Sequence, residues 1–301
     1  MTKSVAVLMG GWSAEREVSL VSGKACADAL ENAGYAVTRI DLTRDVRSLL
    51  DALEPRPDVV FNALHGRWGE DGAIQGLLDM MAIPYTHSGR MASTLAMDKP
   101  LSIQLFRQAG LPTANHVVTD IDALKSGPEP MPRPFVVKPA HEGSSVGVYI
   151  VLDGTNGPDY SAWSYGTAMV EEYVAGQELT VSVMGGKALA VTELRPKQGF
   201  YDYEAKYTDG KTVHLCPAPI SDTLARTCRD LAERAHIALG CRGVTRSDFR
   251  YDPESGRLII LEVNTQPGMT PLSLVPEQAK HLGISFEELV SWMVENASCD
   301  S

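Results

Sequence analysis

The sequence predicts an α/β fold, in which an amino-terminal parallel sheet with helices precedes a larger α+β region of mainly antiparallel strands. Over the first 97 residues, short apolar runs alternate with helical patterns, which is typical of right-handed crossovers in a parallel sheet. Beyond that point, short apolar runs are separated by Gly and Pro, as in antiparallel hairpins. The 301 residues, 44% of them hydrophobic, suffice for about two domains with room for a small third.

The chain opens with a strand, a glycine turn and a helix. Residues 5–9 form an apolar run, Gly10 and Gly11 follow, and a helical pattern that begins at Ser13 extends to Gly34. The alternation then continues with strands and helices in turn, which we expect at residues 36–40, 46–53, 59–64, 73–81 and 83–85.

Two boundaries divide the rest of the chain. A helical segment at 93–97 meets Asp98, Lys99 and Pro100, and proline suits the first turn of a new helix. We therefore expect domains at 1–97, 98–184 and 185–301. In the second and third we expect strands at 135–138, 148–152, 168–173, 179–184 and 188–194, a helix at 222–239, and a last helix that begins with the capping box Ser285–Glu288.

Composition excludes several classes of protein. The net charge of -11 disfavours a nucleic-acid partner, because the chain has no global basic field to neutralise phosphates. No apolar run reaches the roughly 18 residues of a membrane span, and the first residues lead directly into a strand, so we expect a cytoplasmic protein without a membrane partner. The five cysteines are widely spaced without a C-x-x-C pair, and we expect them to be reduced thiols.

A candidate metal site lies near the carboxyl end. Residues 244–250 and 258–264 are expected to pair as a hairpin across Gly256. Arg246 and Asp248 share one face of the first strand, and Glu262 and Asn264 share one face of the second. Asp248, Glu262 and Asn264 supply the oxygen ligands that Mg²⁺ prefers. The alternative is a surface hairpin with solvated charges, in which Asn264 is only a turn residue.

Other segments could hold a phosphate. Lys99 and Lys138 each precede a proline, where a fixed backbone can aim a cationic chain at a polyphosphate. The Gly-Ser-rich residues 141–147 could turn backbone N–H groups around an anion, although they do not match a Walker loop. Backbone groups at the strand end, residues 171–174, could bind an adenine, and the carboxylate of Glu178 could hold the ribose hydroxyls. The alternatives are solvated lysines, a plain flexible turn and an edge hairpin.

Two further segments have open interpretations. The aromatic and charged residues 201–207 form either a packed surface loop or a lid. Glu15 is either a partner of the helix dipole or a carboxylate that binds an ammonium group.

Taken in order, these segments resemble the D-alanine--D-alanine ligases of the ATP-grasp superfamily, and the similarity covers nearly the whole chain. Each match alone is weak, but seven occur in sequence, at residues 10–19, 65–72, 97–99, 137–139, 142–147, 201–207 and 262–270. The resemblance implies an amino-terminal Rossmann-like domain followed by a two-lobed ATP-grasp fold, with ATP held between the lobes. It also implies a homodimer formed through the amino-terminal domain.

The resemblance implies a two-step reaction for peptidoglycan synthesis. The carboxylate of a first D-alanine attacks the γ-phosphate of ATP, and the amine of a second D-alanine then displaces phosphate from the acyl phosphate.

By this resemblance the catalytic residues are Glu15, Ser144, Tyr207, Arg246 and Gly268. The ATP-binding residues are Lys99, Lys138, Glu171, Val174, Glu178 and Lys206. The residues that bind the amino acids are Glu15, His65, Arg246, Gly268, Ser273 and Leu274. The metal ligands are Asp248, Glu262 and Asn264, which would hold Mg²⁺ with Mn²⁺ as a substitute.

Within the family, a tyrosine at the position of Tyr207 accompanies a D-amino acid as second substrate, and phenylalanine accompanies D-lactate. Two residues depart from the family pattern, Trp68 at a place expected to be small and Ser247 at a place that is usually apolar.

Two other functions remain open: a depsipeptide ligase that makes D-alanyl-D-lactate, and a nucleotide-binding regulator without turnover. The regulator should lack a metal carboxylate or Lys99, and this chain has both.

Overall fold

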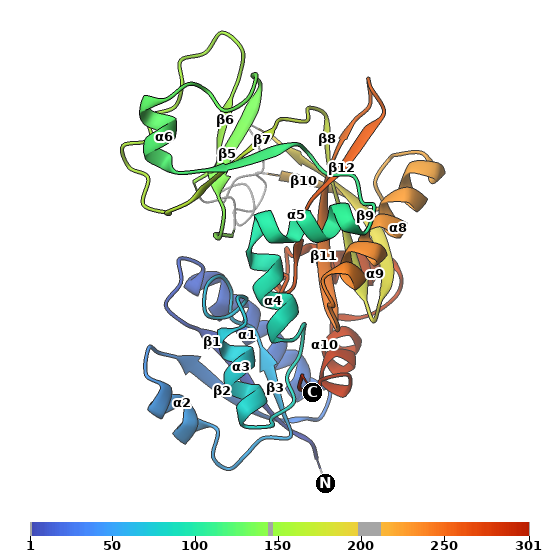
Figure 1. Ribbon diagram of the computed structural model, residues 1–301. Helices are drawn as coiled ribbons and strands as arrows, with labels where there is room; N and C mark the ends of the chain where they lie inside the picture. The colour runs from blue at the N-terminus through green and yellow to red at the C-terminus, as the bar shows by residue number, and fades with distance from the viewer. Residues whose placement is uncertain (1, 144–146, 198–211, 301) are drawn as a thin grey trace.

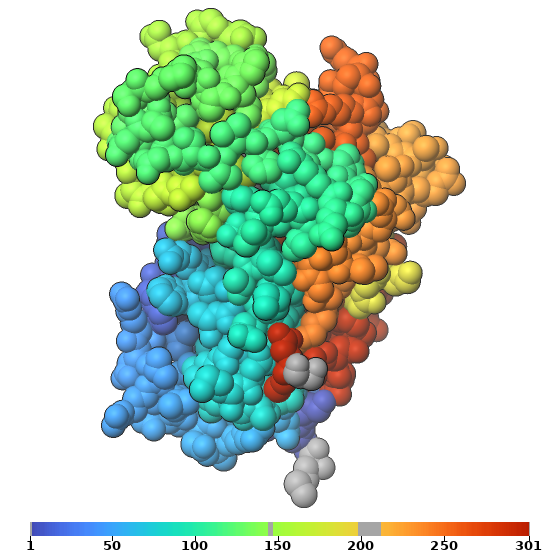
Figure 2. Space-filling model, in the orientation of Figure 1, coloured from blue at the N-terminus to red at the C-terminus, as the bar shows by residue number. Residues whose placement is uncertain are grey.

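The computed structural model describes residues 2–143, 147–197 and 212–300. It confirms the α/β class, because a parallel sheet comes first and two antiparallel sheets follow (Figure 1). In the space-filling view, the green part of the chain, which contains the four-stranded sheet described below, projects above the blue amino-terminal unit and beside the orange carboxyl-terminal part (Figure 2). Within the described residues, no helix is long and apolar enough to cross a membrane.

The amino-terminal unit is a parallel sheet of order β2-β1-β3. Its strands are β1 (Ser4–Gly10), β2 (Ala36–Leu42) and β3 (Val59–Asn62), and its helices are α1 (Arg16–Asn32), α2 (Val46–Ala52) and α3 (Ala73–Met80). Gly10 and Gly11 both have φ of 78°, the left-handed region that glycine adopts without strain. The strand expected at 83–85 is reduced to bridges from Tyr85 to Val60 and to Ser298.

Two short helices lead out of this unit. They are α4 (Arg90–Met97) and α5 (Lys99–Gln108), and the turn between them lies at the expected boundary. The Asp98 carboxylate accepts from the Leu101 N–H at 3.0 Å, so it caps α5 and fixes Lys99 in the first turn. The four-stranded sheet that follows has the order β4-β7-β5-β6. It contains β4 (His116–Thr119), β5 (Phe135–Pro139), β6 (Tyr149–Val151) and β7 (Ala168–Glu172), with α6 (Ile121–Ser126) at its edge.

The third sheet has the order β10-β9-β8-β11-β12 and is antiparallel. Its strands are β8 (Gln177–Met184), β9 (Lys187–Pro196), β10 (Thr212–Leu215), β11 (Val244–Asp252) and β12 (Arg257–Asn264), with α8 (Asp222–Ala238) and α9 (Leu274–His281) nearby. Strand β8 hydrogen-bonds to β9 and β11, although residues 177–184 were expected to end the central lobe. The division of the chain into three domains stays a prediction.

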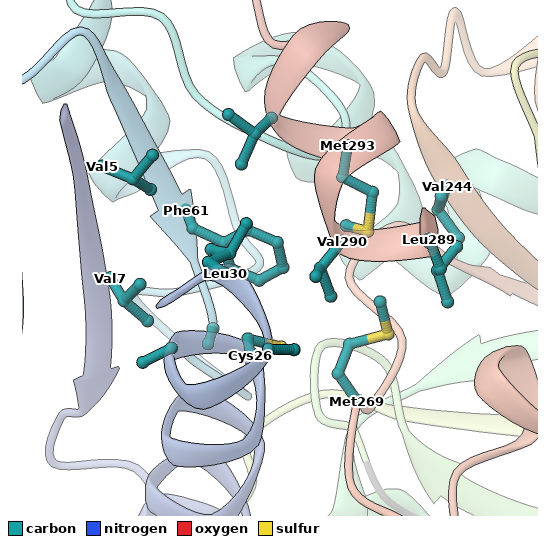
Figure 3. Close-up of a cluster of buried hydrophobic side chains, with 14 of the residues drawn as sticks. Val5, Val7, Cys26, Leu30, Phe61, Val244, Met269, Leu289, Val290 and Met293 are labelled. Atoms are coloured by element: carbon teal, nitrogen blue, oxygen red, sulfur yellow. The ribbon is translucent and has the colours of Figure 1, made fainter. Parts of the chain in front are cut away.

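The last helix returns to the first sheet. Helix α10 (Phe286–Glu295) begins at a capping box, in which the Glu288 N–H donates to Ser285 Oγ at 3.1 Å and the Ser285 N–H donates to Glu288 Oε2 at 2.8 Å. Figure 3 shows side chains of α10 pointing toward α1 and β3. The buried cluster that joins these elements contains Leu30, Phe61, Leu289, Val290 and Met293, all at most 2% exposed.

Truncating this cluster should destabilise the whole chain. The change Leu289→Ala should lower the free energy of unfolding by about 2–5 kcal/mol, because it removes buried methyl groups and leaves a cavity. Urea unfolding followed by circular dichroism measures the loss. The control Leu282→Ala, at a side chain that is 50% exposed, should change it by less than about 0.5 kcal/mol. Equal effects of the two changes would contradict the role given to α10.

A buried histidine should make stability fall in mild acid. Burial lowers the pKa of His236 to about 4, and its Nδ1 lies 2.8 Å from Thr245 Oγ1. The folded state then stays neutral between pH 6.5 and 4 while the unfolded state takes up a proton. The contribution of neutral His236 to the free energy of unfolding is therefore fully present above pH 6.5 and is lost as pH falls toward 4.

We expect His236→Gln to reduce the slope of unfolding free energy against pH by about 1.4 kcal/mol per unit between pH 6 and 5. Urea midpoints at several pH values measure this slope. The exposed His281→Gln is the matched control. An unchanged slope in His236→Gln would show that His236 is protonated in the folded protein.

Candidate active site

Two adjoining pockets are lined by residues of the amino-terminal unit and of the two antiparallel sheets. The smaller, with a volume of about 80 Å³, is polar, and its lining includes Glu15, His65, Glu70, Arg246, Asn264, Gly268, Ser273 and Leu274. The larger, of about 320 Å³, is lined among others by Lys138, Glu171, Val174, Glu178, Asp248, Arg250, Ile259 and Leu261. Lys99, Glu142, Gly143 and Glu262 line both. The described residues expected to bind ATP, metal and amino acid therefore line one continuous region.

The hairpin places four polar side chains together, as its sequence predicts. In the β11–β12 register, Arg246 lies opposite Asn264 and Asp248 lies opposite Glu262. Directly opposed residues project from the same face of a sheet. The register shifts immediately after Asp248, so Leu261 is an extra residue in β12. Such a bulge re-aims neighbouring side chains and is common beside active sites.

The donor set at this hairpin fits a hard divalent cation. Asp248 Oδ1 accepts from Arg246 Nε at 2.9 Å and from Thr180 Oγ1 at 2.7 Å, and Oδ2 accepts from Arg246 Nη2 at 2.7 Å. By these contacts Oδ2 keeps one lone pair for a metal. Glu262 and Asn264 add carboxylate and carboxamide oxygens, which suit Mg²⁺ or Mn²⁺. Among the described residues, no group of three His, Cys, Asp or Glu could hold a metal.

Both predicted lysines lie at this region. Lys99 Nζ lies 3.7 Å from Glu262 Oε2 and also donates to the Glu142 carbonyl oxygen. Lys138 Nζ lies 2.6 Å from Glu171 Oε1, and these two side chains are 9% and 6% exposed. A cation buried to this degree is held by its charged partner, so neither lysine is a freely solvated surface side chain.

The larger pocket combines apolar walls with charged ends. Val136, Ile150, Leu194, Ile259 and Leu261 supply the apolar lining, from β5, β6, β9 and β12. The segment between β7 and β8, including Tyr173 and Val174, crosses between the two antiparallel sheets. A flat aromatic ring suits an apolar slot between sheets.

Arg250 braces this crossing. Its Nε donates to the Val174 carbonyl oxygen at 3.0 Å, and its Nη1 lies 3.5 Å from Glu178 Oε2. Two residues that were expected to bind ATP are thus positioned by one arginine on β11.

The smaller pocket gathers acidic and imidazole side chains from the amino-terminal unit. His65 Nδ1 lies 3.3 Å from Glu70 Oε1, which also accepts from the Gly66 N–H at 2.8 Å. Burial raises the pKa of Glu70; contacts with His65 lower it, and the charge of Glu15 raises it further. Glu15 is 7% exposed, so its carboxylate faces the pocket and not bulk water.

Ser22 joins His65 to the segment after β12. The Met269 N–H donates to Ser22 Oγ at 3.3 Å, and Ser22 Oγ lies 3.1 Å from His65 Nε2. The resemblance to the ligases described above implies that a backbone N–H near Gly268 and Met269 contacts the oxyanion of the reaction. The N–H of Met269 is engaged by Ser22, which leaves that of Gly268.

Ser273 and Leu274 lie at the start of α9 and line the smaller pocket. Ser273 Oγ accepts from the Thr270 N–H at 2.9 Å and gives no side-chain cap to its own helix. The first-turn N–H groups of α9 therefore lack this cap, and such groups suit an anion. Ser144, Lys206 and Tyr207 lie outside the described residues, so their expected roles stay predictions.

The two departures from the family pattern have unusual local environments. Trp68 has φ of 75°, a backbone conformation that favours glycine, and its ring lies 5.9 Å from that of Trp12. Ser247 is fully buried, and its Oγ has no hydrogen-bond partner among the described residues.

Sequence reasoning missed several residues that shape the site. Glu70 was quoted only within a matching stretch, and Ser22, Thr180 and Arg250 were not assigned a function. Thr180 and Arg250 could have been found from strand pairing, because they lie next to Asp248 on β8 and β11, whereas Ser22 becomes visible only when α1 is placed against the segment after β12.

Comparison with known proteins agrees with this geometry. A family model described as "D-ala D-ala ligase C-terminus" matches residues 105–295, and one described as "D-ala D-ala ligase N-terminus" matches residues 46–88. The chain is 58% identical over 300 residues to the D-alanine--D-alanine ligase of Acidiphilium cryptum, and the match covers 99% of each chain. It is 56% identical over 305 residues to that of Rhodospirillum rubrum, and the match covers 100% of each.

A solved structure shares the whole fold. The D-alanine--D-alanine ligase of Bacillus anthracis complexed with ATP superposes with a TM-score of 0.81 at 31% identity, over 98% of this chain and 97% of that one. The two antiparallel sheets that enclose the larger pocket therefore form the two lobes of an ATP-grasp fold. With full-length relatives above 50% identity and family matches in both halves, this chain belongs to the D-alanine--D-alanine ligase family.

Proposed function

We propose that this enzyme joins two D-alanine molecules to D-alanyl-D-alanine for peptidoglycan precursor synthesis, with conversion of ATP to ADP and phosphate. The observation that carries the proposal is the continuity of the two pockets through Lys99, Glu142, Gly143 and Glu262. A polyphosphate in the larger pocket would present its terminal group to a carboxylate in the smaller one. That proximity is what an acyl phosphate requires.

The larger pocket binds ATP in this proposal. The adenine lies in the apolar slot beside Val174, and Glu178 receives the ribose hydroxyls. Lys138 and Lys99 meet the phosphates as point charges, and Lys206 is assigned to the γ-phosphate. Support comes from the lining of the pocket and from the short Lys138–Glu171 contact, which a nucleotide phosphate can share.

The metal ligands in this proposal are Asp248, Glu262 and Asn264, with Mg²⁺ as the usual ion and Mn²⁺ as its substitute. When bound, the ion neutralises phosphate charge as the γ-phosphate is transferred. Arg246 holds Asp248 in place through its two hydrogen bonds and extends the positive charge toward the smaller pocket.

The smaller pocket binds the amino acids. Glu15 receives the ammonium of the first D-alanine, with His65 beside it, and Ser273 and Leu274 receive the carboxylate of the second. Arg246 and the N–H of Gly268 stabilise the oxyanion that forms when the second amine attacks the acyl phosphate. Ser144 and Tyr207 are assigned to catalysis and to lid closure, which keeps water from the acyl phosphate.

We also propose a cytoplasmic location and a homodimer formed through the amino-terminal domain. The location is supported by five free cysteines and by the origin of ATP in that compartment. The homodimer rests on the family resemblance. Light scattering on the purified chain tests it.

One assay tests the reaction. ADP formation is measured at neutral pH with D-alanine, L-alanine and D-lactate in parallel, with and without Mg²⁺, and the product is identified by mass. The expected result is ADP and D-alanyl-D-alanine with D-alanine and Mg²⁺ only. Turnover with D-lactate and not with D-alanine would identify a depsipeptide ligase. Tight ATP binding without turnover would identify a nucleotide-binding regulator.

A further inference from the structure

Two segments on which the site depends meet behind the smaller pocket. The turn that starts at the last residue of β3, residues 62–70, carries His65 and Glu70. The segment that starts at the last residue of β12, residues 264–270, carries Asn264 and Gly268. The side chain of Gln266 links these two segments. It is 1% exposed, and none of the roles assigned above involves it.

The carboxamide of Gln266 bridges two groups of the first segment. Asn62 Nδ2 donates to Gln266 Oε1 at 2.6 Å, and Gln266 Nε2 donates to the Leu64 carbonyl oxygen. Asn62 Oδ1 accepts from the Leu64 N–H at 3.2 Å, and Asn62 Nδ2 also donates to the Gly69 carbonyl oxygen at 3.0 Å. These hydrogen bonds form a closed chain that runs from the N–H of Leu64 through Asn62 and Gln266 to the carbonyl oxygen of Leu64.

That arrangement fixes which way both carboxamides point. The N–H of Leu64 can only donate, so the atom of Asn62 facing it is oxygen and its nitrogen faces Gln266. Gln266 must then present oxygen to Asn62 and nitrogen to the Leu64 carbonyl oxygen. A backbone group of known polarity therefore anchors each end, and no alternative orientation satisfies all of these contacts.

The same residue also holds a candidate metal ligand. The backbone N–H of Gln266 donates to Asn264 Oδ1 at 2.8 Å. One residue therefore connects the side chain of Asn264, on the phosphate side, with the segment that positions His65, on the amino-acid side.

We propose that Gln266 is a positioning residue that sets the separation of the two segments, and so the separation of the first amino acid from the phosphates. This inference rests on the proposed function. Gln266 touches no reactant and acts through Asn264 and the 62–70 turn. Misplacement of reacting groups by about 1 Å can cost on the order of a hundredfold in rate.

A second buried carboxamide that contacts the same turn supplies a matched control. Gln75, on α3, is also 1% exposed, and its Nε2 donates to the Gly69 carbonyl oxygen at 2.8 Å. Its Oε1 has no hydrogen-bond partner among the described residues. Gln75 therefore braces the 62–70 turn from within the amino-terminal unit, whereas Gln266 joins that turn to the segment after β12.

The test compares Gln266→Met with Gln75→Met. Methionine keeps the length of the side chain and removes its polar end. Thermal midpoints are measured for both variants, and kcat and KM for ATP and for D-alanine are measured at the same interval below each midpoint. Should Gln266→Met fail to fold, Gln266→Glu replaces it, because it keeps the acceptor for Asn62 and loses the donor to Leu64.

We expect Gln266→Met to lower kcat ten- to a hundredfold while KM for ATP changes less than twofold. Gln266→Glu should lower kcat by a smaller factor. Gln75→Met should keep kcat within twofold even if its thermal midpoint falls as far as that of Gln266→Met. Equal kcat in Gln266→Met and Gln75→Met would overturn the inference, as would a change in ATP affinity larger than that in kcat. Failure of the proposed function is distinguishable, because the unmodified protein would then form no ADP with D-alanine.

Discussion

Replacing Arg246 by alanine should lower kcat for ADP formation by on the order of a hundredfold or more, while the Kd for ATP changes little. Arg246 lines the smaller pocket and not the larger one, so its loss removes charge where the tetrahedral intermediate forms and removes no side chain that lines the larger pocket. Steady-state kinetics with D-alanine gives kcat, and isothermal calorimetry with ATP gives the Kd.

The substitution Arg246→Lys separates charge from geometry. Lysine keeps the positive charge and cannot reproduce the two parallel contacts that Arg246 makes with Asp248. It should therefore recover only part of the lost rate. Collapse of ATP affinity with turnover preserved at saturation would show that Arg246 serves the nucleotide and not the oxyanion.

Replacing Lys138 by methionine should affect both stability and ATP binding. Removal of the lysine leaves Glu171 buried without its partner, which should cost about 3–5 kcal/mol of unfolding free energy. KM for ATP should rise as well, because a phosphate contact is lost. Urea unfolding and steady-state kinetics measure the two effects.

The double change Lys138→Met with Glu171→Gln distinguishes these effects. It removes both charges, so most of the lost stability should return, while KM for ATP should stay high. Recovery of KM together with stability would mean that Lys138 is structural and does not contact ATP.

The hairpin at the candidate metal site was predicted correctly because strand periodicity determines which side chains share a face. A period of two places Arg246 with Asp248 and Glu262 with Asn264, and one turn at Gly256 leaves few ways to pair the strands. Local sequence therefore sufficed for this part of the site. The bulge after Asp248 was not predicted, because one extra residue changes no local pattern.

Other features depend on contacts that are distant in sequence. Whether β8 joins the central or the last sheet depends on its partners β9 and β11, and its own residues fit either position. Four short elements were missed: β4, α6, β10 and α9. Each has at most eight residues, and such short patterns resemble loops until tertiary packing stabilises them.

The side-chain contacts of Gln266 also could not be predicted from the sequence, because they join residues that are distant in the chain. A glutamine after Asn264 reads as an ordinary loop residue, and its partner Asn62 lies about 200 positions earlier in the chain. The contact exists because β3 and β12 end near one another, which only the assembled fold establishes.

The docking of α10 also bears on how the protein is made. The core beneath the first sheet contains side chains from residues 289–294, so this sheet is synthesised long before the helix that covers it. Until then its apolar face is exposed to other nascent chains and to chaperones. A fragment that ends at residue 97 should aggregate when expressed alone, and a separately supplied peptide spanning 284–297 should improve its recovery.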